Sequence, residues 1–335
     1  MNVAVLGLGF MGATHLSAWR KAPHARVTAV MSSNETKLSG DLTSIEGNLG
    51  GSGERFDFSG MRKYRRIEDA LAADDIDAVD ICLPTDLHAP TAIAALRAGK
   101  HVLLEKPMAL DTADADSIQR AAVECNRLLM VGHVLRFIPT YRAAAEWIAG
   151  AGQVHSALFR RRCAAPTWSA WLLDEKRSGG SVCDLLIHDT DYCISLWGMP
   201  KAVRATGSRD LSRGIDVISA ELQYDRLGPV TVTGGWHHPR AYPFSMEFTI
   251  VADAGTLEWS SADSRGLMLY SLDGEGRALP LDANDPFEAE LRYFTECARA
   301  GRQPDLCPPS QSRDAVALSR LMLRSREHNG QTSAV

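Results

Sequence analysis

The residue types best suited to proton transfer in this sequence form a pair. Asp184 and His188 stand four residues apart, so on a helix they share one face, where a carboxylate can orient an imidazole. Imidazole transfers protons near neutral pH, which favours acid–base chemistry. An exposed Asp–His pair on a helix surface has the same spacing. A metal site would need a third ligand, for which only the distant His133 is available, so we expect no metal.

A lysine at the end of an apolar run is the second candidate. Residues 101–104 predict a strand that ends in Glu105 and Lys106, and Pro107 stiffens the turn that follows. In open α/β sheets the carboxyl ends of the strands border the ligand crevice, so Lys106 is placed to contact a ligand. An ordinary solvated lysine is the alternative.

A glycine-rich loop predicts a dinucleotide site. Gly7, Gly9 and Gly12 follow the apolar run 3–6 directly and open a predicted helix, which is the context that the motif requires. The glycines allow a tight turn, close approach of the diphosphate, and packing of the helix on the strand. The helix N-terminus, with Phe10 and Met11, supplies N–H groups and partial positive charge. A strand–turn–helix without a ligand is the alternative.

The end of the second predicted strand bears on which dinucleotide is bound. An acidic residue there normally accepts the ribose hydroxyls of NAD, but the sequence has Ser32 and Ser33 and no carboxylate before Glu35. The two serines, with Lys37, Arg62 or Lys63, offer donors and positive charge for a 2′-phosphate. We therefore expect NADP in preference to NAD.

The elements that must position these residues begin with alternating strands and helices, which are typical of a parallel sheet wrapped by helices. This predicts a doubly wound α/β Rossmann domain over residues 1–132. Residues 38–60, rich in Gly and Ser, are expected to form a loop insertion. The predicted strands cover 3–6, 27–31, 78–83, 101–104 and 128–131, and the predicted helices cover 12–20, 67–73, 90–98 and 112–125.

From residue 133 the pattern changes to period-2 stretches joined by glycine-containing turns. This predicts an α+β domain over 133–335 with a large, mostly antiparallel, open-faced sheet, which would suit a homodimer or homotetramer. The expected strands cover 154–160, 219–224, 230–236, 246–251, 256–259 and 267–272. Helices are expected at 140–148, 183–197, 287–300 and 313–325, and residues 330–335 are expected to fray.

In combination these motifs resemble the Gfo/Idh/MocA family of NAD(P)-dependent oxidoreductases, over nearly the whole chain. The resemblance implies that Lys106 lies at the nicotinamide and the substrate, and that His188, paired with Asp184, transfers the proton. The sequence departs from the family pattern at residues 185–187, where it has Leu-Leu-Ile and the family often has a glycine. The motifs that carry the resemblance are the glycine loop, the run 77–85 with His88, the run 98–107, residues 131–133, Arg136-Phe137 with Pro139, and Gly179-Gly180 ahead of Asp184. The cofactor contacts that it implies are Leu83, Pro84, Thr85, His88, Glu105, Lys106 and Arg136.

The resemblance further implies hydride transfer between nicotinamide and a sugar, cyclitol or related polyhydroxylated substrate. Lys106 would stabilise the developing alkoxide, although the proton carrier could be either Lys106 or His188. Trp168 and Trp171 could wall a sugar pocket or belong to core and surface. Two alternatives are an NAD-dependent glycoside-cleaving enzyme of the same fold and a non-catalytic dinucleotide sensor, although a sensor would be expected to lack Lys106 or His188.

The composition excludes several other classes of function. A net charge of −5 over 335 residues gives no electrostatic case for binding nucleic acid or an anionic membrane. No apolar stretch is long enough to span a bilayer, and the first residues are expected to form a strand rather than a signal peptide. Seven scattered cysteines favour a reducing, cytoplasmic environment.

Overall fold

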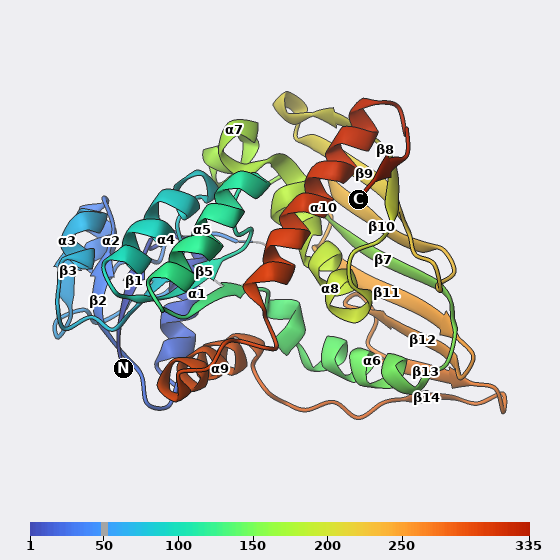
Figure 1. Ribbon diagram of the computed structural model, residues 1–335, viewed down its shortest axis with the longest axis horizontal. Helices are drawn as coiled ribbons and strands as arrows, with labels where there is room; N and C mark the ends of the chain where they lie inside the picture. The colour runs from blue at the N-terminus through green and yellow to red at the C-terminus, as the bar shows by residue number, and fades with distance from the viewer. Residues whose placement is uncertain (48–52) are drawn as a thin grey trace. The chain divides into compact units, whose positions relative to one another are not determined.

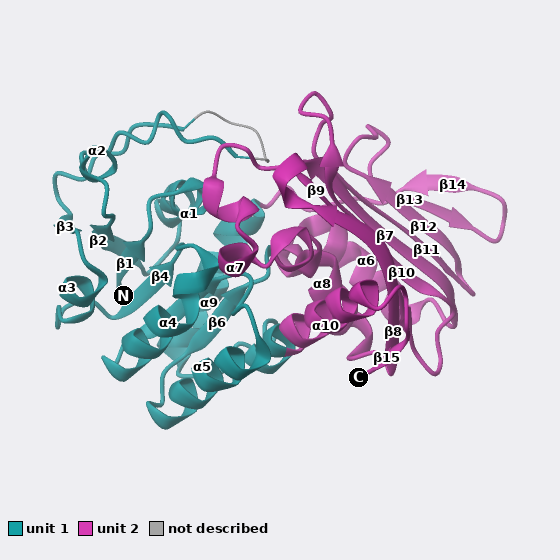
Figure 2. Cartoon of the chain, turned by 90° about the horizontal axis from the view of Figure 1, so that it is seen from above, with its two compact units in different colours: residues 1–134, 285–313 teal, residues 135–284, 314–335 magenta. Residues whose placement is uncertain are grey.

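The computed structural model describes residues 1–47 and 53–335 and divides them into two compact units (Figures 1 and 2). Unit 1 comprises Met1–Val134 and Asp285–Arg313, and unit 2 comprises Leu135–Asn284 and Asp314–Val335. The sequence-based division at 132/133 therefore differs from the structure in its second part, because residues 285–313 return to the first unit. No helix among the described residues is both long enough and apolar enough to cross a membrane.

Unit 1 is built on a six-stranded parallel sheet with the order β3-β2-β1-β4-β5-β6. The order reverses between β1 and β4, which is the switch point where doubly wound sheets bind ligands. The predicted Rossmann topology is confirmed. Its strands are β1 (Asn2–Leu6), β2 (Arg26–Met31), β3 (Arg62–Tyr64), β4 (Ala78–Ile81), β5 (His101–Glu105) and β6 (Leu129–Gly132).

Helices flank this sheet, and the last of them comes from far along the chain. Helix α9 packs against α1, where the rings of Phe294 and Trp19 meet edge to face at 6.5 Å. This contact explains why residues 285–313 belong to unit 1. The helices are α1 (Phe10–Trp19), α2 (Glu35–Leu38), α3 (Ile67–Leu71), η1 (Thr85–Leu87), α4 (His88–Arg97), α5 (Thr112–Glu124) and α9 (Pro286–Ala300).

The expected loop insertion at 38–60 is partly visible. Gly50 and Gly51 lie outside the described residues, but the segment that follows them packs against α1. Phe56 and Phe58 are buried and stacked at 5.9 Å, and the Arg20 guanidinium lies 4.4 Å from the centre of the Phe56 ring. This part of the loop therefore has its own hydrophobic contacts.

Unit 2 is built on a nine-stranded sheet with the order β14-β13-β12-β11-β7-β10-β9-β8-β15. All its pairs are antiparallel except β7 with β10, so the predicted mostly antiparallel sheet is confirmed. The strands are β7 (Val154–Ala164), β8 (Ala202–Asp210), β9 (Ile215–Gln223), β10 (Val230–His238), β11 (Ser245–Ala252), β12 (Gly255–Ser260), β13 (Met268–Ser271), β14 (Gly276–Ala278) and β15 (Ser333–Ala334).

Three helices of unit 2, α6, α8 and α10, lie along one face of this sheet (Figure 2). An aromatic cluster fills the space between helix and strand: Tyr192 of α8 meets Tyr141 of α6 and Phe159 of β7 edge to face. The helical segments are η2 (Val134–Phe137), α6 (Pro139–Gly150), η3 (Ala170–Leu173), α7 (Glu175–Ser178), a π-helical turn η4 (Val182–Leu186), α8 (Ile187–Trp197), η5 (Leu211–Arg213) and α10 (Pro309–Glu327).

The chain end corrects one expectation, the fraying of residues 330–335. Ser333 and Ala334 pair with β8, and the Val335 N–H donates to the Lys201 carbonyl at 3.0 Å. The Ser325 hydroxyl also donates to the Gln331 carbonyl at 2.6 Å. Backbone hydrogen bonds order this segment. The sequence carries no sign of them, because the small side chains of these residues have no strand pattern.

Candidate functional site

The glycine loop of unit 1 has the geometry that a diphosphate requires. Gly7 adopts φ +100°, and a Cβ there would come 2.4 Å from the Cys82 carbonyl oxygen, so this turn needs glycine. A Cβ at Gly12 would come 2.0 Å from the Gly7 carbonyl oxygen, whereas one at Gly9 would meet nothing within 4 Å. Gly9 also starts α1 without a side-chain cap, and the first turn of α1 carries no acidic residue. The loop thus presents open space and uncapped N–H groups, including those near Phe10 and Met11, which suits a diphosphate.

The turns after β4 and β5 are joined to each other by a buried histidine. His88 Nδ1 lies 2.7 Å from the Pro107 carbonyl oxygen, and its Nε2 lies 2.8 Å from that of Leu83. Burial lowers the pKa of His88, against the raising effect of these two carbonyl contacts. His88 therefore ties the Leu83–Pro84–Thr85 segment to the turn that carries Lys106, rather than presenting its ring to solvent.

Lys106 itself is the exception in a buried stretch. Residues 102–105 and 107–109 are buried, and Lys106 alone among them is partly exposed. Its peptide bond to Pro107 is cis. Its backbone N–H donates to Glu105 Oε2 at 3.1 Å. Of the two charged residues predicted at this strand end, Glu105 is therefore buried and Lys106 is accessible.

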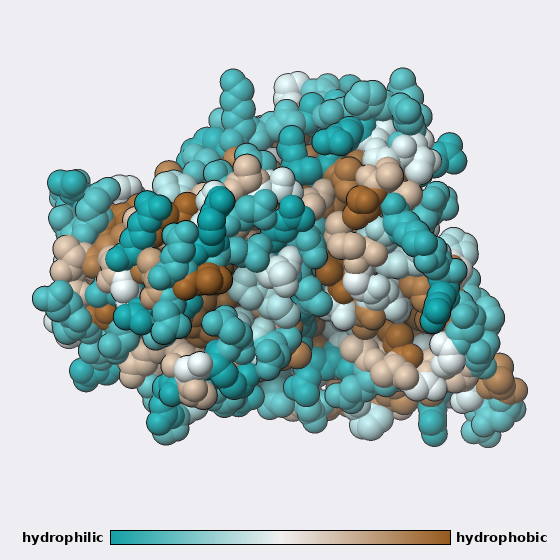
Figure 3. Space-filling model, in the orientation of Figure 1, coloured by the Kyte–Doolittle hydropathy of each residue, from teal (hydrophilic) through white to brown (hydrophobic). Residues whose placement is uncertain are grey.

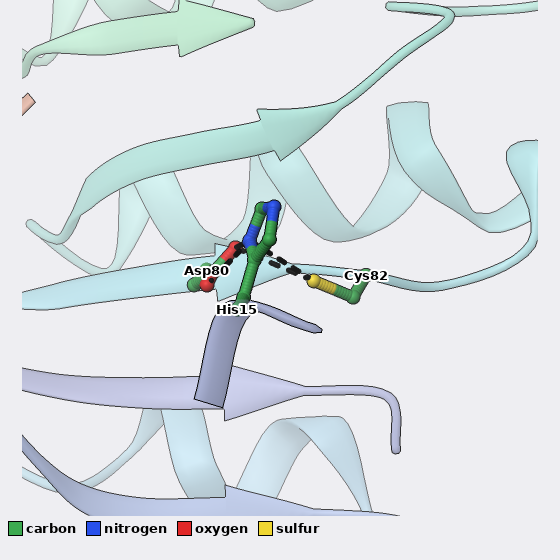
Figure 4. Close-up of side chains that lie close together, drawn as sticks. All are labelled: His15, Asp80 and Cys82. Atoms are coloured by element: carbon green, nitrogen blue, oxygen red, sulfur yellow. Dashed lines mark hydrogen bonds and ion pairs between the residues drawn. The ribbon is translucent and has the colours of Figure 1, made fainter. Parts of the chain in front are cut away.

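Sequence reasoning missed a buried group of charged and polar side chains beside these residues. Figure 4 shows three of them, His15, Asp80 and Cys82. His15 Nδ1 lies 3.0 Å from Asp80 Oδ2, and its Nε2 lies 3.0 Å from Glu105 Oε1. The Trp19 indole N–H donates to Asp80 Oδ2 at 2.7 Å, and the Cys82 thiol donates to Asp80 Oδ1 at 3.4 Å. The available signal was Asp80, a carboxylate in the middle of a strand that is otherwise apolar and buried on both faces.

The grouping of His15, Asp80 and Cys82 has the residue types of a metal site, with ligand atoms within 4.8 Å of one another. Burial lowers the pKa of His15, but the Asp80 carboxylate and the Cys82 sulfur outweigh it and raise that pKa well above its ordinary value. Burial also raises the pKa of the Cys82 thiol. A metal ion bound here would have to displace the protons that these shifts favour.

The residues expected near the adenosine ribose behave differently from one another. Ser32 is buried, and its hydroxyl accepts the Asn34 N–H at 3.2 Å, whereas Ser33 is exposed. Lys37 lies in α2, and burial lowers the pKa of its ammonium group. Arg62 is engaged by Asp75 at 2.6 Å. Ser33 and Lys37 are thus better candidates than Arg62 for contact with a 2′-phosphate.

In unit 2 the predicted catalytic pair occupies the start of the long helix. Asp184 lies in the π-helical turn η4 and His188 in the first turn of α8. From Ser178 to Ile194 every residue is buried except these two, which are partly exposed. Both residues of the expected pair are accessible, although a π-turn replaces the first turn of the expected regular helix, and their shared face stays a prediction. Such turns are frequent at functional sites.

Two buried ion pairs hold this helix. Asp189 accepts from Arg161 Nε and Nη2 at 2.7 and 3.0 Å, and Asp191 accepts from Arg136 Nε and Nη2 at 2.9 and 2.6 Å. Both pairs are bidentate, which fixes orientation as well as charge. Arg136 thus anchors α8, and its expected contact with the cofactor stays a prediction.

The two tryptophans lie near this segment in sequence but differ in burial. Trp168 is 38% exposed, and Trp171, in the short helix η3, is partly buried. The neighbours of Trp171 in η3, Leu172 and Leu173, pack against a buried cluster that includes Trp236. Of the two, Trp168 is the more available to a ligand.

The fold and these features define a class: an oxidoreductase with a Rossmann domain for a nicotinamide dinucleotide and a second α+β domain. Residues 1–133 match the oxidoreductase family with an NAD-binding Rossmann fold, and residues 141–258 match the GFO/IDH/MocA C-terminal domain. The chain belongs to the GFO/IDH/MocA oxidoreductase family.

Individual relatives support this assignment. The chain is 31% identical over 325 residues to 4-carboxy-2-hydroxymuconate-6-semialdehyde dehydrogenase of Sphingobium sp. (strain NBRC 103272 / SYK-6), covering 91% of this chain and 92% of the relative. It is 34% identical over 247 residues to 1,5-anhydro-D-fructose reductase of Ensifer adhaerens, covering 71% and 74%. The structure of aldose-aldose oxidoreductase from Caulobacter crescentus superimposes with a TM-score of 0.84 at 23% identity, covering 100% and 99% of the two chains.

Proposed function

We propose that this protein transfers hydride between a nicotinamide cofactor and a hydroxyl-bearing carbon of a sugar, cyclitol or related polyhydroxylated molecule. The observation that carries the proposal is the exposure pattern. In two otherwise buried stretches, the partly exposed side chains are Lys106 in one and Asp184 and His188 in the other. A functional group must be both accessible and held, and these three combine the two properties.

The roles follow from the chemistry of the side chains. When bound, the nicotinamide supplies the acceptor or donor of the hydride. His188 takes the hydroxyl proton on oxidation and returns it on reduction, Asp184 orients the imidazole, and the Lys106 ammonium stabilises the developing alkoxide. The glycine loop, with Gly9 as its open position, would hold the diphosphate.

We infer a preference for NADP. The end of β2 offers Ser33 and the partly buried Lys37, and the nearest carboxylate, Glu35, is engaged by Arg65 at 2.5 Å. A neutral-to-positive environment tolerates a 2′-phosphate that an aspartate would repel. The ratio of kcat/KM for NADP and NAD tests this preference, and Lys37→Gln should lower that ratio.

The decisive experiment is a substrate screen in which sugars and inositols are offered with each cofactor and nicotinamide absorbance is read. Turnover that is stoichiometric with product supports a dehydrogenase. Product formed with no net change in absorbance would instead indicate glycoside cleavage with a retained cofactor. Binding of cofactor with no turnover of any compound would favour a sensor.

A second substrate class has one observation in its favour. The relative matched over 91% of this chain is named a dehydrogenase of a carboxylated semialdehyde. The screen should therefore include carboxylated hydroxy and semialdehyde compounds beside the neutral polyols.

We also propose that copies of the chain associate through the face of the nine-stranded sheet opposite α6, α8 and α10. On β7 this face carries Leu158, which is 38% exposed. Light scattering of the purified protein tests this assembly, since a monomer would exclude it. A cytoplasmic location is supported by the seven cysteines, which are thiols rather than disulfides in the structure.

A further inference from the structure

A buried charged network lies beside the glycine loop and consists of His15, Asp80 and Glu105, here called the His15 network. His15 comes from α1, Asp80 from β4 and Glu105 from β5, so the network joins three elements of unit 1. The imidazole lies between the two carboxylates, at 3.0 Å from each, and His15 and Asp80 are fully buried while Glu105 is 5% exposed. The proposed function assigns no task to His15 or Asp80.

The network is organised around one cation. Two buried carboxylates are unfavourable without a neutralising partner, and the His15 imidazolium contacts both of them. The other groups that face it do not replace this charge: the Cys82 thiol and the Trp19 indole both donate to Asp80. From α9 the Phe287 ring lies 6.0 Å from the imidazole ring.

A further acidic side chain lies on the Glu105 side of the network. Glu290 of α9 is fully buried. A Cβ placed at Gly132 would come 3.2 Å from Glu105 Oε1 and 3.5 Å from Glu290 Oε1, so both carboxylates border Gly132.

The network ends at the backbone of Lys106. Glu105 Oε1 lies 3.0 Å from His15 Nε2 as an ion pair without hydrogen-bond alignment, and Oε2 accepts the Lys106 N–H at 3.1 Å. We propose that His15 is a positioning residue for Lys106: its imidazolium orients the Glu105 carboxylate, which in turn holds the Lys106 N–H and so the start of the Lys106 side chain. The expected effect on turnover rests on the proposed function of Lys106. The expected effect of His15 on the position of the Lys106 backbone does not.

The test uses His15→Gln in the full chain, because glutamine keeps a hydrogen-bonding side chain but removes the charge. We expect the backbone N–H of Lys106 to exchange with solvent about tenfold faster or more, while the N–H groups of Leu103 and Leu104 change little. We also expect kcat to fall about tenfold or more through misplacement of the ammonium, with the KM for the cofactor nearly unchanged. His24→Asn is the matched control, since His24 is exposed in the same unit and asparagine tolerates its φ of +65°.

Each outcome decides the proposal. Unchanged exchange at Lys106 would overturn it, as would equally faster exchange along the whole of β5, which a purely structural role would give. If the wild-type chain turns over none of the screened compounds, the proposed function fails while the exchange result still stands. If His15→Gln does not fold, nitrogen spectra of histidine-labelled wild-type protein at a pH of about 7.5 decide, because a ring protonated on only one nitrogen contradicts the proposal.

Discussion

Partial exposure distinguishes the three candidate catalytic side chains from their buried neighbours, and each can be removed separately. We expect Lys106→Met and His188→Gln each to lower kcat by about 10²–10⁴, the usual contribution of acid–base and electrostatic groups. Both variants should still bind the cofactor, although Lys106 is itself an expected cofactor contact, because the glycine loop proposed to hold the diphosphate is unchanged. Steady-state kinetics with calorimetric cofactor binding measures this, and full activity of the His188 variant would contradict its role.

The raised pKa of His15 predicts how stability depends on pH. The ordinary histidine pKa of about 6.5 applies in the unfolded chain, and Asp80 raises it in the folded state in spite of burial. The folded state therefore binds the proton more tightly. The contribution of His15 to the free energy of unfolding is complete below pH of about 6.5 and is lost as the pH rises through the folded-state pKa.

Thermal melting across the alkaline range measures this dependence. The wild-type melting temperature should fall more steeply with rising pH than that of His15→Gln, with His24→Asn following the wild type. Parallel curves for the wild type and His15→Gln would show that the proton on His15 adds nothing to stability.

At the scale of elements, most strands and helices of unit 1 were predictable because their apolar runs are continuous and end at glycine or charged residues. The strand β8 was not, because its second half is exposed and polar and so lacks alternation. The π-turn that carries Asp184 was also hidden, since the run 183–197 has an ordinary helical pattern. The four-residue spacing of Asp184 and His188 predicted a shared face, and both side chains are partly exposed in the structure.

The sequence could identify Lys106 and the glycine loop because doubly wound sheets bind ligands at the carboxyl ends of their strands and need glycines in the first turn. It could not identify His15, Arg161 or the anchoring role of Arg136. His15 has no special neighbours in sequence, and its partners Asp80 and Glu105 are 65 and 90 residues away. Only the packing of three elements brings these charges together.

The anchoring of α8 yields a prediction for one element. Arg161→Met leaves the Asp189 carboxylate buried without its partner, so we expect a loss of about 3–5 kcal/mol in the free energy of unfolding. Arg161→Met combined with Asp189→Leu should recover much of this loss, because no buried charge remains. Denaturant unfolding of the two variants measures the difference, and equal losses in both would show that the pair acts by shape alone.

At the scale of the whole molecule, the two units share the chain in an interrupted order. The backbone leaves unit 1 after Val134, returns at Asp285 and leaves again after Arg313. The face drawn in Figure 3 is mostly hydrophilic, with hydrophobic side chains in small separate groups. The hydrophobic contacts that complete unit 1, such as Trp19 with Phe294, thus join residues 275 positions apart.

This arrangement predicts that a fragment of residues 1–132 is not a stable substitute for unit 1. Without α9 the fragment exposes Trp19 and lacks the Glu288 partner of Lys21, which lies at 2.5 Å. We expect the fragment to melt well below the full chain and to bind NADP weakly. A longer fragment that joins residues 1–134 to 285–313 through a flexible linker should recover both properties. If the short fragment were as stable as the joined one, α9 would be dispensable.

Because α9 belongs to unit 1, it also determines when unit 1 can be completed during translation. Chains emerge from the ribosome amino-terminus first at about 5–20 residues per second, and domains usually fold as they emerge. Here unit 1 still lacks α9 when the last strand of its sheet, β6, has been translated. Helix α9 (Pro286–Ala300) is complete only after about 170 further residues have been translated, and until then Trp19 of α1 lacks its contact with Phe294. We expect chaperones to bind the exposed hydrophobic surface during that interval, and a chain truncated ahead of α9 to keep that surface exposed.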